Sequence, residues 1–363
     1  MTTWHTEQIL ILTASSGLGT FAPALRLRAY LRAQGAKTHL YCVEQLFDEA
    51  ALDKHHATRA RCRADFRTAL LLQKVVEQGG ANINQVIDPD KLATMMHLWQ
   101  QTQFTRCIVF SGFWLSVLAL MQPEYVPVRS VDAIHMDTVS SSSWLHAQGV
   151  MHQLDIAVQD IYLFKANRST VYHLYPVDKP LEWEARAARV LCHGGGWQMG
   201  NLAAVSESLK RKAIHSDIIV SADAALSSSI NQRVFKTDPN YQPWNSMDAL
   251  PALTLCAESN QAESHNQIEF DSLTASAAAI ITKPGGASLL DSLNFATPLI
   301  LLPAFGEYEM HNARTWLSLG FAVTFEQWQA NDCSFELLRT LHNNLLSQSS
   351  VPAIFGVFNE TRN

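Results

Sequence analysis

The chain has 363 residues, of which 47% are hydrophobic and 17% are charged. This balance is typical of a globular protein and excludes a disordered or fibrous one, and the length favours two domains. Lys and Arg total 27 against 33 Asp and Glu, which gives a net charge of -6. We therefore expect no nucleic-acid partner, because binding to a phosphate backbone requires clustered positive charge.

Strands and helices alternate in the first half of the chain. A short apolar run is followed by a turn containing Gly17 and Gly19, then by leucines among arginines, as on an amphipathic helix. Such alternation favours a parallel sheet covered by helices. The expected strands are residues 9–12, 38–43, 107–110 and 131–135, and the expected first helix is residues 23–34.

The longest apolar run, residues 107–121, is broken by Ser111, Gly112 and Ser116. It is shorter than the roughly 20 residues that span a bilayer, so we interpret it as a buried strand and a buried helix. Residues 1–8 lack the basic stretch of a signal peptide. These features predict a soluble protein and leave contact with a membrane surface open.

Six cysteines are scattered without a CxxC spacing, which argues against a zinc site or a redox pair. Several lie in apolar runs typical of strands, so we interpret them as buried free thiols in a reducing cytoplasm. They are Cys42, Cys62, Cys107, Cys192, Cys256 and Cys333.

A basic stretch contains Arg59, Arg61, Arg63 and Arg67. A solvated helix face explains such a stretch. A surface that binds an anionic acceptor is the alternative, and the sequence leaves both open.

The strand–turn–helix order begins again after a proline-containing segment. Pro176 and Pro180 interrupt both helical and sheet hydrogen bonding, so we place the domain boundary here, with domains at 1–178 and 179–363. The repeated order predicts a second Rossmann-like domain. Its expected strands are residues 189–192, 217–221, 252–256, 278–282 and 299–302, and its expected helices are residues 202–214 and 335–346.

Two glycine-rich turns in the second half are candidates for binding a diphosphate. A turn between a parallel strand and a helix directs bare backbone N–H groups to the positive end of that helix. The first turn contains Gly194, Gly195, Gly196 and Trp197. Glycine also occurs in such turns for steric reasons alone, and this alternative stays open.

The second turn, residues 283–286, lies between an apolar strand and a helix that carries Ser288 and Asp291. These two side chains are three residues apart and share a helix face. We predict that Ser288 contacts phosphate, that Lys283 adds positive charge, and that Asp291 accepts hydrogen bonds from a ribose. Stabilisation of the helix start is the alternative role of Ser288 and Asp291. The candidate donor-binding residues here are Lys283, Gly285, Gly286, Ala287, Ser288 and Asp291.

Glu307, Glu309 and Asn312 follow the next predicted strand. Carboxylates and an amide at the carboxyl end of a parallel strand are well placed to hold the hydroxyl groups of a sugar. A solvated loop is the alternative.

Residues 283–291, 296–298 and 307–313 together resemble the donor-site signature of GT-B glycosyltransferases. The branch that they resemble contains the peptidoglycan lipid-intermediate N-acetylglucosaminyltransferase, the galactolipid synthases and the UDP-glycosyltransferases. The resemblance implies two Rossmann-like α/β domains facing across a cleft, with a nucleotide sugar, expected to be UDP-linked, on the second domain. Asp291 stands where a ribose-binding Glu is usual, and Ala296 replaces the usual Gly.

The first-domain loop is also similar, less specifically, to the loop that opens this family's acceptor domain. Ser16, Gly17 and Gly19 are therefore the candidate acceptor-side residues. Many relatives carry a catalytic His in this loop, where the present chain has Thr20. A Thr is not a general base at neutral pH.

We therefore expect the base to lie elsewhere, and His135 and Asp137 are the candidates, because they should lie at the end of a first-domain strand that faces the cleft. A structural role for His135 is one alternative. The other is an acceptor nucleophilic enough to need little help, such as an amine.

The sequence thus predicts a cytoplasmic glycosyltransferase that moves a sugar from a nucleoside diphosphate to an unidentified acceptor. We expect no metal, because no DxD-like motif occurs in a suitable place, and no cofactor besides the donor substrate. A sugar-nucleotide epimerase is one alternative. A catalytically silent glycosyltransferase-like protein that binds a nucleotide or serves as a partner subunit is another, and Thr20 favours it.

Overall fold

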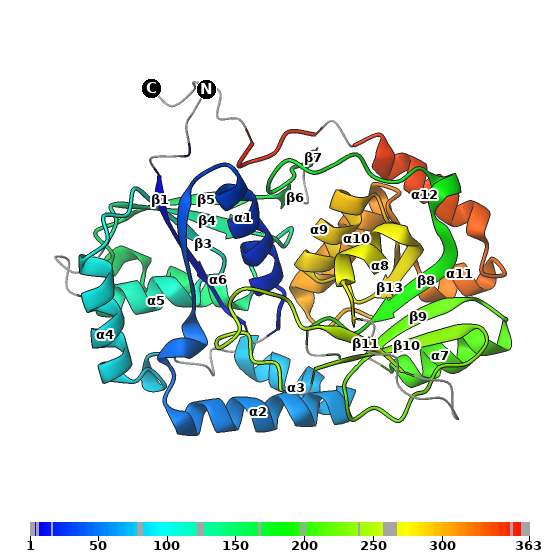
Figure 1. Cartoon of the computed structure of the whole chain (residues 1–363), viewed down its shortest axis with the longest axis horizontal. Coiled ribbons are helices and arrows are strands. Elements are labelled where there is room, and N and C mark those ends of the chain that lie inside the picture. The colour runs from blue at the N-terminus through cyan, green and yellow to red at the C-terminus, as the bar shows by residue number, and fades with distance from the viewer. Residues whose placement is uncertain are drawn as a thin grey trace. The chain divides into compact units, whose positions relative to one another are not determined.

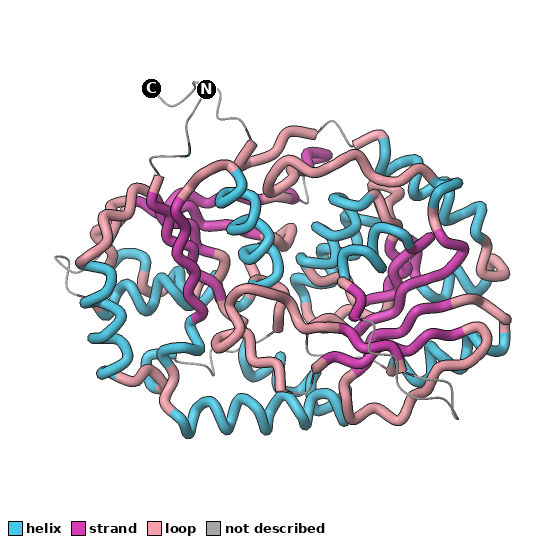
Figure 2. Tube along the Cα trace, viewed as in Figure 1, coloured by secondary structure: helices cyan, strands magenta, loops and turns pink. Residues whose placement is uncertain are grey.

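The structure, a computed structural model, describes residue 4 and residues 7–15, 17–77, 83–121, 127–165, 168–196, 198, 201–238, 240–256, 267–348 and 351–356. The chain divides into two compact units (Figure 1). Unit 1 is Met1–Pro176 with Gln242–Ala249 and Pro352–Asn363, and unit 2 is Val177–Tyr241 with Leu250–Val351. Each unit builds its helices around a parallel or mostly parallel sheet of its own (Figure 2).

The sheet of unit 1 has five parallel strands in the order β2-β1-β3-β4-β5. The interior strand β1 contains an unbroken apolar run, Ile9 to Leu12, and all four of these residues are buried, as in a strand covered on both faces. The strands are β1 (Gln8–Thr13), β2 (Lys37–Cys42), β3 (Arg106–Val109), β4 (Ser130–His135) and β5 (Ala157–Tyr162).

The helices of unit 1 bury one core that includes Leu10, Leu12, Val109 and Trp114. The Trp114 indole N–H donates to the carbonyl oxygen of Thr13 at 2.6 Å, which ties the helix after β3 to the end of β1. The helices are α1 (Phe21–Ala33), α2 (Glu49–Ala64), α3 (Phe66–Glu77), α4 (Pro89–Gln100), α5 (Phe113–Leu120) and α6 (Ser142–Gln148). A short antiparallel pair, β6 (Phe164–Lys165) and β7 (Arg168–Val171), follows β5.

The sheet of unit 2 has the order β12-β11-β10-β9-β8-β13-β14-β15, and β11 alone among these strands runs opposite to the others, antiparallel to both β10 and β12. The strands are β8 (Ala187–His193), β9 (Ser216–Val220), β10 (Gln232–Thr237), β11 (Leu253–Leu255), β12 (Gln267–Ile268), β13 (Ala277–Thr282), β14 (Leu299–Leu301) and β15 (Ala322–Thr324). The helices are α7 (Leu202–Arg211), α8 (Phe270–Ser276), α9 (Gly286–Phe295), α10 (Glu307–Ser318), α11 (Phe325–Ala330) and α12 (Phe335–Leu346).

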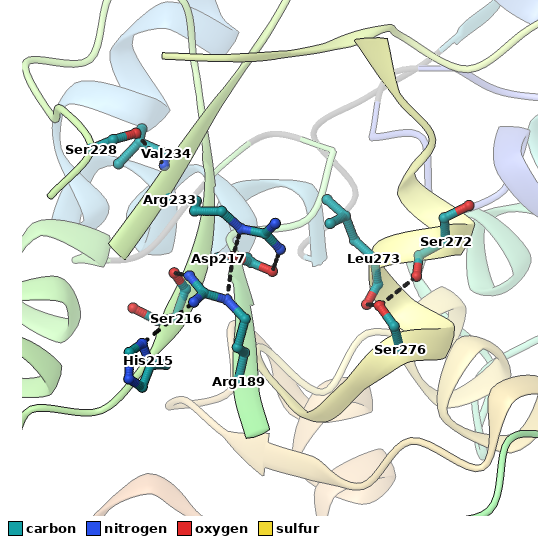
Figure 3. Close-up of polar contacts among 10 residues, drawn as sticks. All are labelled: Arg189, His215, Ser216, Asp217, Ser228, Arg233, Val234, Ser272, Leu273 and Ser276. Carbon is teal, nitrogen blue, oxygen red and sulfur yellow. Dashed lines mark hydrogen bonds and ion pairs between the residues drawn. The ribbon is translucent and has the colours of Figure 1, made fainter. Parts of the chain in front are cut away.

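A buried carboxylate joins three neighbouring strands of unit 2 (Figure 3). Asp217 on β9 accepts a hydrogen bond from Nε of Arg189 on β8 at 2.9 Å and two from Arg233 on β10 at 2.7 and 2.6 Å. Because Asp217 is only 4% exposed, its charge depends on these two guanidinium groups for compensation. The cluster lies near the amino ends of the strands, so it leaves their carboxyl ends free for other contacts.

Most of the strands expected from the sequence are confirmed, and α12 spans the predicted residues 335–346. The run 252–256 holds β11, but this strand is antiparallel to β10. Among the strands that the sequence analysis did not anticipate are β5 and β10. Both lack a clean apolar signal, since β5 is a partly exposed edge strand and β10 is half polar.

The domain boundaries differ from the single break predicted after residue 178. The first break, after Pro176, is close to it, but Gln242–Ala249 and the segment from Pro352 belong to unit 1. In Gln242–Ala249, the Trp244 ring packs against His55 and His56 of α2, and Asp248 forms an ion pair with Arg28 of α1 at 2.9 Å. A few anchoring side chains in a short segment give no signal of their own in a sequence.

The six cysteines are free thiols, and five of them are buried. Burial raises the pKa of the Cys42, Cys107 and Cys192 thiols far above the usual range, which makes these groups unreactive. No helix in the described part of the chain combines the length and the apolar composition that crossing a membrane requires.

Candidate functional site

The strand order of unit 2 reverses between β8 and β13. In sheets of this kind, ligands bind at the carboxyl ends of the two strands that flank such a reversal, because the segments that follow them leave in opposite directions. Cys192 on β8 pairs with Ile281 on β13, and the Thr282 hydroxyl lies 3.5 Å from Nδ1 of His193. The two glycine-rich turns that the sequence analysis singled out therefore start side by side at the reversal point.

Helix α9 begins immediately after the second turn and has no side-chain cap. The Gly285 amide donates to the carbonyl oxygen of Lys283 at 2.9 Å, and the first helical hydrogen bond runs from Leu289 to Gly285 at 3.1 Å. The amides of Gly286, Ala287 and Ser288 have no acceptor among the described residues. Three unpaired N–H groups at a helix start form a positive site for an anion.

Gly285 is not required by the fold. Its φ of -75° and ψ of 151° are open to any residue, and a methyl group at this position would meet only Oε1 of Glu309, at an ordinary 3.7 Å. The steric explanation for glycine therefore does not account for Gly285. Gly195 is different, because its φ of +69° favours glycine on backbone grounds.

In the turn after β8, one backbone amide is already hydrogen-bonded within the protein. The Gly195 N–H donates to Nδ1 of His193 at 3.1 Å, and His193 is 7% exposed. Burial, with a smaller contribution from Lys283, lowers the His193 pKa to about 4, so the ring is neutral and can accept this bond. Donor binding by Gly194 and Gly196 stays a prediction, and Trp197 lies outside the described residues.

The residues predicted around the second turn gather at one edge of unit 2, where several contact one another. Nζ of Lys283 lies 2.9 Å from Oε1 of Glu309, and the two side chains are 10% and 4% exposed. Nδ2 of Asn312 donates to the carbonyl oxygen of Pro284 at 3.0 Å. Glu307 is exposed at the start of α10.

Ser288 and Asp291 lie within α9 and are 7% and 5% exposed. Ser288 lies in the first turn of α9, and Asp291 follows three residues later on the same face of the helix. Their predicted contacts with phosphate and ribose stay predictions.

In unit 1 the reversal lies between β1 and β3. The loop after β1 is held by Glu44, a buried carboxylate whose two oxygens each accept from the Ser15 amide at 2.9 Å. The Thr20 hydroxyl donates to the carbonyl oxygen of Ala14 at 2.6 Å, which gives Thr20 a structural contact within the loop. Ser16 lies outside the described residues.

The two small residues Gly17 and Gly19 complete this loop. A methyl group at Gly19 would meet no atom within 4 Å, so open space adjoins the chain there. Leu18 between them has a φ of 57°, a conformation that costs energy for a branched side chain. The loop therefore has room beside it, as an acceptor-side loop needs, and its role stays a prediction.

His135 ends β4 at the same edge of the unit 1 sheet. Its ring stacks on the Tyr162 ring with 4.1 Å between the ring centres, and 4.4 Å separates it from the centre of the Trp144 ring. Its Nε2 lies 2.8 Å from Oδ1 of Asp160. Nδ1 is buried and has no partner among the described residues. Burial lowers the His135 pKa, and Asp160 partly opposes that shift.

Asp137, the other candidate base, follows two residues after His135 and is half-buried. The sequence analysis missed Asp160 on β5, which orients His135, and Glu44, which holds the first loop. Each acts on a residue far away in the sequence, and only the pairing of parallel strands could have indicated the connection between Asp160 and His135.

No protein-family model matches the sequence, and no curated protein matches it. Solved structures do match. The glycosyltransferase SnogD from Streptomyces nogalater matches with a TM-score of 0.54 over 96% of this chain and 96% of its own, at 12% identity. Acinetobacter baumannii MurG matches with a TM-score of 0.50 over 95% of this chain and 96% of its own, at 14% identity.

The protein has the GT-B glycosyltransferase fold. A third GT-B match is the glycosyltransferase VinC in complex with dTDP, with a TM-score of 0.50 over 95% of this chain and 96% of its own, at 12% identity. Matches that extend over almost the whole length of both chains confirm the fold expected from the sequence, with two Rossmann-like units. At this level of identity the GT-B likeness concerns the fold, and function depends on the site itself.

Proposed function

We propose that this protein transfers a sugar from a nucleoside-diphosphate sugar, expected to be UDP-linked, to an acceptor held by unit 1. The observation that carries the proposal lies at the strand-order reversal of unit 2, where the amides of Gly286, Ala287 and Ser288 have no acceptor within the described ranges of the chain. Transfer of the sugar leaves a nucleoside diphosphate, and fixed N–H dipoles stabilise the charge that develops on it.

The matches to SnogD and VinC support the proposal, since both are described as glycosyltransferases and VinC was solved with dTDP, a nucleoside diphosphate. The site of unit 2 agrees with a diphosphate as ligand, because backbone amides at a helix start bind phosphate oxygens. We propose that these dipoles suffice without a divalent ion, and activity that survives a chelator such as EDTA is the expected result.

We propose His135 as the base that deprotonates the acceptor, with Asp160 holding its tautomer. If Nε2 carries the proton donated to Asp160, Nδ1 keeps a lone pair that can accept a proton. Thr20 does not compete for this role, because its hydroxyl already donates to Ala14. Asp137 remains the second candidate base.

The test is nucleotide binding by isothermal titration calorimetry with UDP, dTDP and GDP, followed by assays with the matching sugar donors. The variant Gly285→Ala should raise the Kd of the preferred nucleotide about tenfold, or about 1.4 kcal/mol. Its methyl group has room in the protein but stands beside the amides. The control Gly19→Ala, in unit 1, should leave nucleotide binding unchanged. Failure of all three nucleotides to bind would contradict the proposal.

A catalytically silent nucleotide-binding protein is the second candidate, and the presence of Thr20 in place of a catalytic His favours it. Nucleotide binding without hydrolysis or transfer across a broad set of acceptors would support this candidate. Conversion of the donor in the absence of any acceptor would indicate an epimerase instead.

A further inference from the structure

We propose that Lys283 and Glu309 position the amides of α9, and that neither one contacts the donor directly. The inference rests on the proposed function, because it concerns how the diphosphate site of unit 2 is held in shape. The two residues come from different elements, since Lys283 follows β13 and Glu309 lies in the first turn of α10.

Both oxygens of the Glu309 carboxylate are in use. Oε1 pairs with Nζ of Lys283 at 2.9 Å, and Oε2 accepts from the Phe305 amide at 2.6 Å. The side chain of Glu309 is 4% exposed. A sugar hydroxyl could bind Glu309 only by sharing or replacing one of these contacts, which would leave a buried group without its partner.

Lys283 is held just as firmly. Its ammonium group pairs with Glu309 and lies 4.8 Å from the centre of the Phe305 ring, a favourable cation–π distance. Its charge is therefore compensated inside unit 2. A direct ion pair with phosphate would require Lys283 to leave both contacts.

These contacts act on the residues that come directly before the unpaired amides. Glu309 fixes Lys283, and one helical turn later Asn312 donates to the carbonyl oxygen of Pro284 at 3.0 Å. The next residue, Gly285, has its α carbon close to Glu309, because a methyl group there would lie 3.7 Å from Oε1. Helix α10 thus sets the path of residues 283–285, and that path determines where the N–H groups of 286–288 point.

The experiment separates positioning from direct contact by comparing the Kd of UDP with the Kd of a UDP-sugar. If the wild-type protein prefers another nucleotide, that nucleotide and its sugar derivative replace the UDP pair. Glu309→Gln removes the charge but keeps an oxygen that can accept from Phe305. If Glu309 positions the amides, this variant raises the Kd of both ligands by about the same factor, on the order of tenfold. If only the UDP-sugar binds more weakly, Glu309 contacts the sugar and the inference is wrong.

A double-mutant cycle on UDP affinity tests Lys283. Lys283→Met should weaken UDP binding about as much as Glu309→Gln, and the double variant no more than either single one, because all three lose the same ion pair. Additive losses would show that Lys283 contacts phosphate independently and would overturn the inference.

Glu309→Asp serves as a second variant if Glu309→Gln does not fold. It keeps the charge but shortens the side chain by one carbon, so the affinities for UDP and for the UDP-sugar should fall in parallel, and divergence would count against positioning. If wild type binds no nucleotide at all, the proposed function fails. The same cycle measured by urea unfolding then still shows whether Lys283 and Glu309 are coupled.

Discussion

Helices α1 and α9 each follow a strand that flanks the strand-order reversal of its unit, α1 after β1 and α9 after β13. Their first turns differ. In α1 the Ala22 amide bonds to Leu18 at 2.9 Å, the Ala24 amide bonds to Thr20 at 3.3 Å, and Pro23 has no N–H. In α9 the first three amides have no acceptor in the part of the chain that the structure describes. The start of α9 thus offers more N–H groups to an anion than the start of α1 does.

This difference indicates that the fold places a helix start beside the strand-order reversal and that local hydrogen bonding decides how many of its N–H groups remain available. Positive φ at a non-glycine residue does not distinguish the two units. Leu18, in the loop after β1, has a φ of 57°, and Gln198, in the loop after β8, has a φ of 54°. Backbone strain therefore occurs in one loop of each unit.

We expect the largest effect from lowering the pH, which should reduce the free energy of unfolding of unit 2 through His193. The folded pKa of His193, about 4, lies below the usual 6.5, so its contribution to stability is complete above pH 6.5 and is lost as the pH falls towards 4. We expect a loss of about 3 kcal/mol over this interval, measured by urea unfolding.

The variant His193→Asn is the control for this loss. Its side-chain oxygen can still accept from the Gly195 amide, but it does not titrate, so the variant should lack this part of the pH dependence. His55 in unit 1 also has a pKa lowered to about 4, by burial and by Arg59, and its acid sensitivity should remain in the variant. An unchanged pH dependence in His193→Asn would contradict the assignment.

The variant Asp160→Asn tests whether His135, at the carboxyl edge of the unit 1 sheet, takes part in proton transfer. We expect kcat to fall about a hundredfold, because the His135 tautomer is no longer held. The pKa of His135 should fall further, since Asp160 opposes the effect of burial, and the acid limb of the pH–rate profile should move to lower pH. An NMR titration of His135 checks the pKa independently of activity, and Asp155→Asn, on an exposed residue before β5, is the control.

The variant Gly286→Pro tests directly whether the N–H groups at the start of α9 bind the nucleotide. Proline suits the first position of a helix, and the extended backbone of Gly285 suits the residue before a proline, so α9 should persist with one amide fewer. Nucleotide affinity should fall about 30-fold, or about 2 kcal/mol. The matched control is Glu49→Pro at the first position of α2 in unit 1, which also follows extended backbone and should leave affinity unchanged.

Thr20→Val should have the smallest effect. It removes one hydrogen bond to Ala14, so the free energy of unfolding should fall by about 1 kcal/mol. The pH–rate profile should keep its shape, because Thr20 takes no part in proton transfer. A shift of that profile would place Thr20 in the proton transfer and contradict this prediction.

Part of the candidate site could be predicted from residue types alone. The Pro-Gly-Gly turn and the helix after it were identified because an apolar strand, glycines and a capping pattern are local features, and the turn indeed leads into α9. The pairing of Lys283 with Glu309 could not be predicted, because these residues are 26 positions apart and meet only when β13 and β14 lie side by side. The same holds for His135 and Asp160, which meet through β4 and β5.

The sequence by itself determined the alternation of strands and helices, the two Rossmann-like halves and the places of the glycine turns, because hydrophobic periodicity and backbone preference act over a few neighbouring residues. Only the tertiary structure decided which N–H groups and charges remain available. Hydrogen bonds and ion pairs between distant segments use up some polar groups and spare others, and at α9 they spare the amides of Gly286, Ala287 and Ser288.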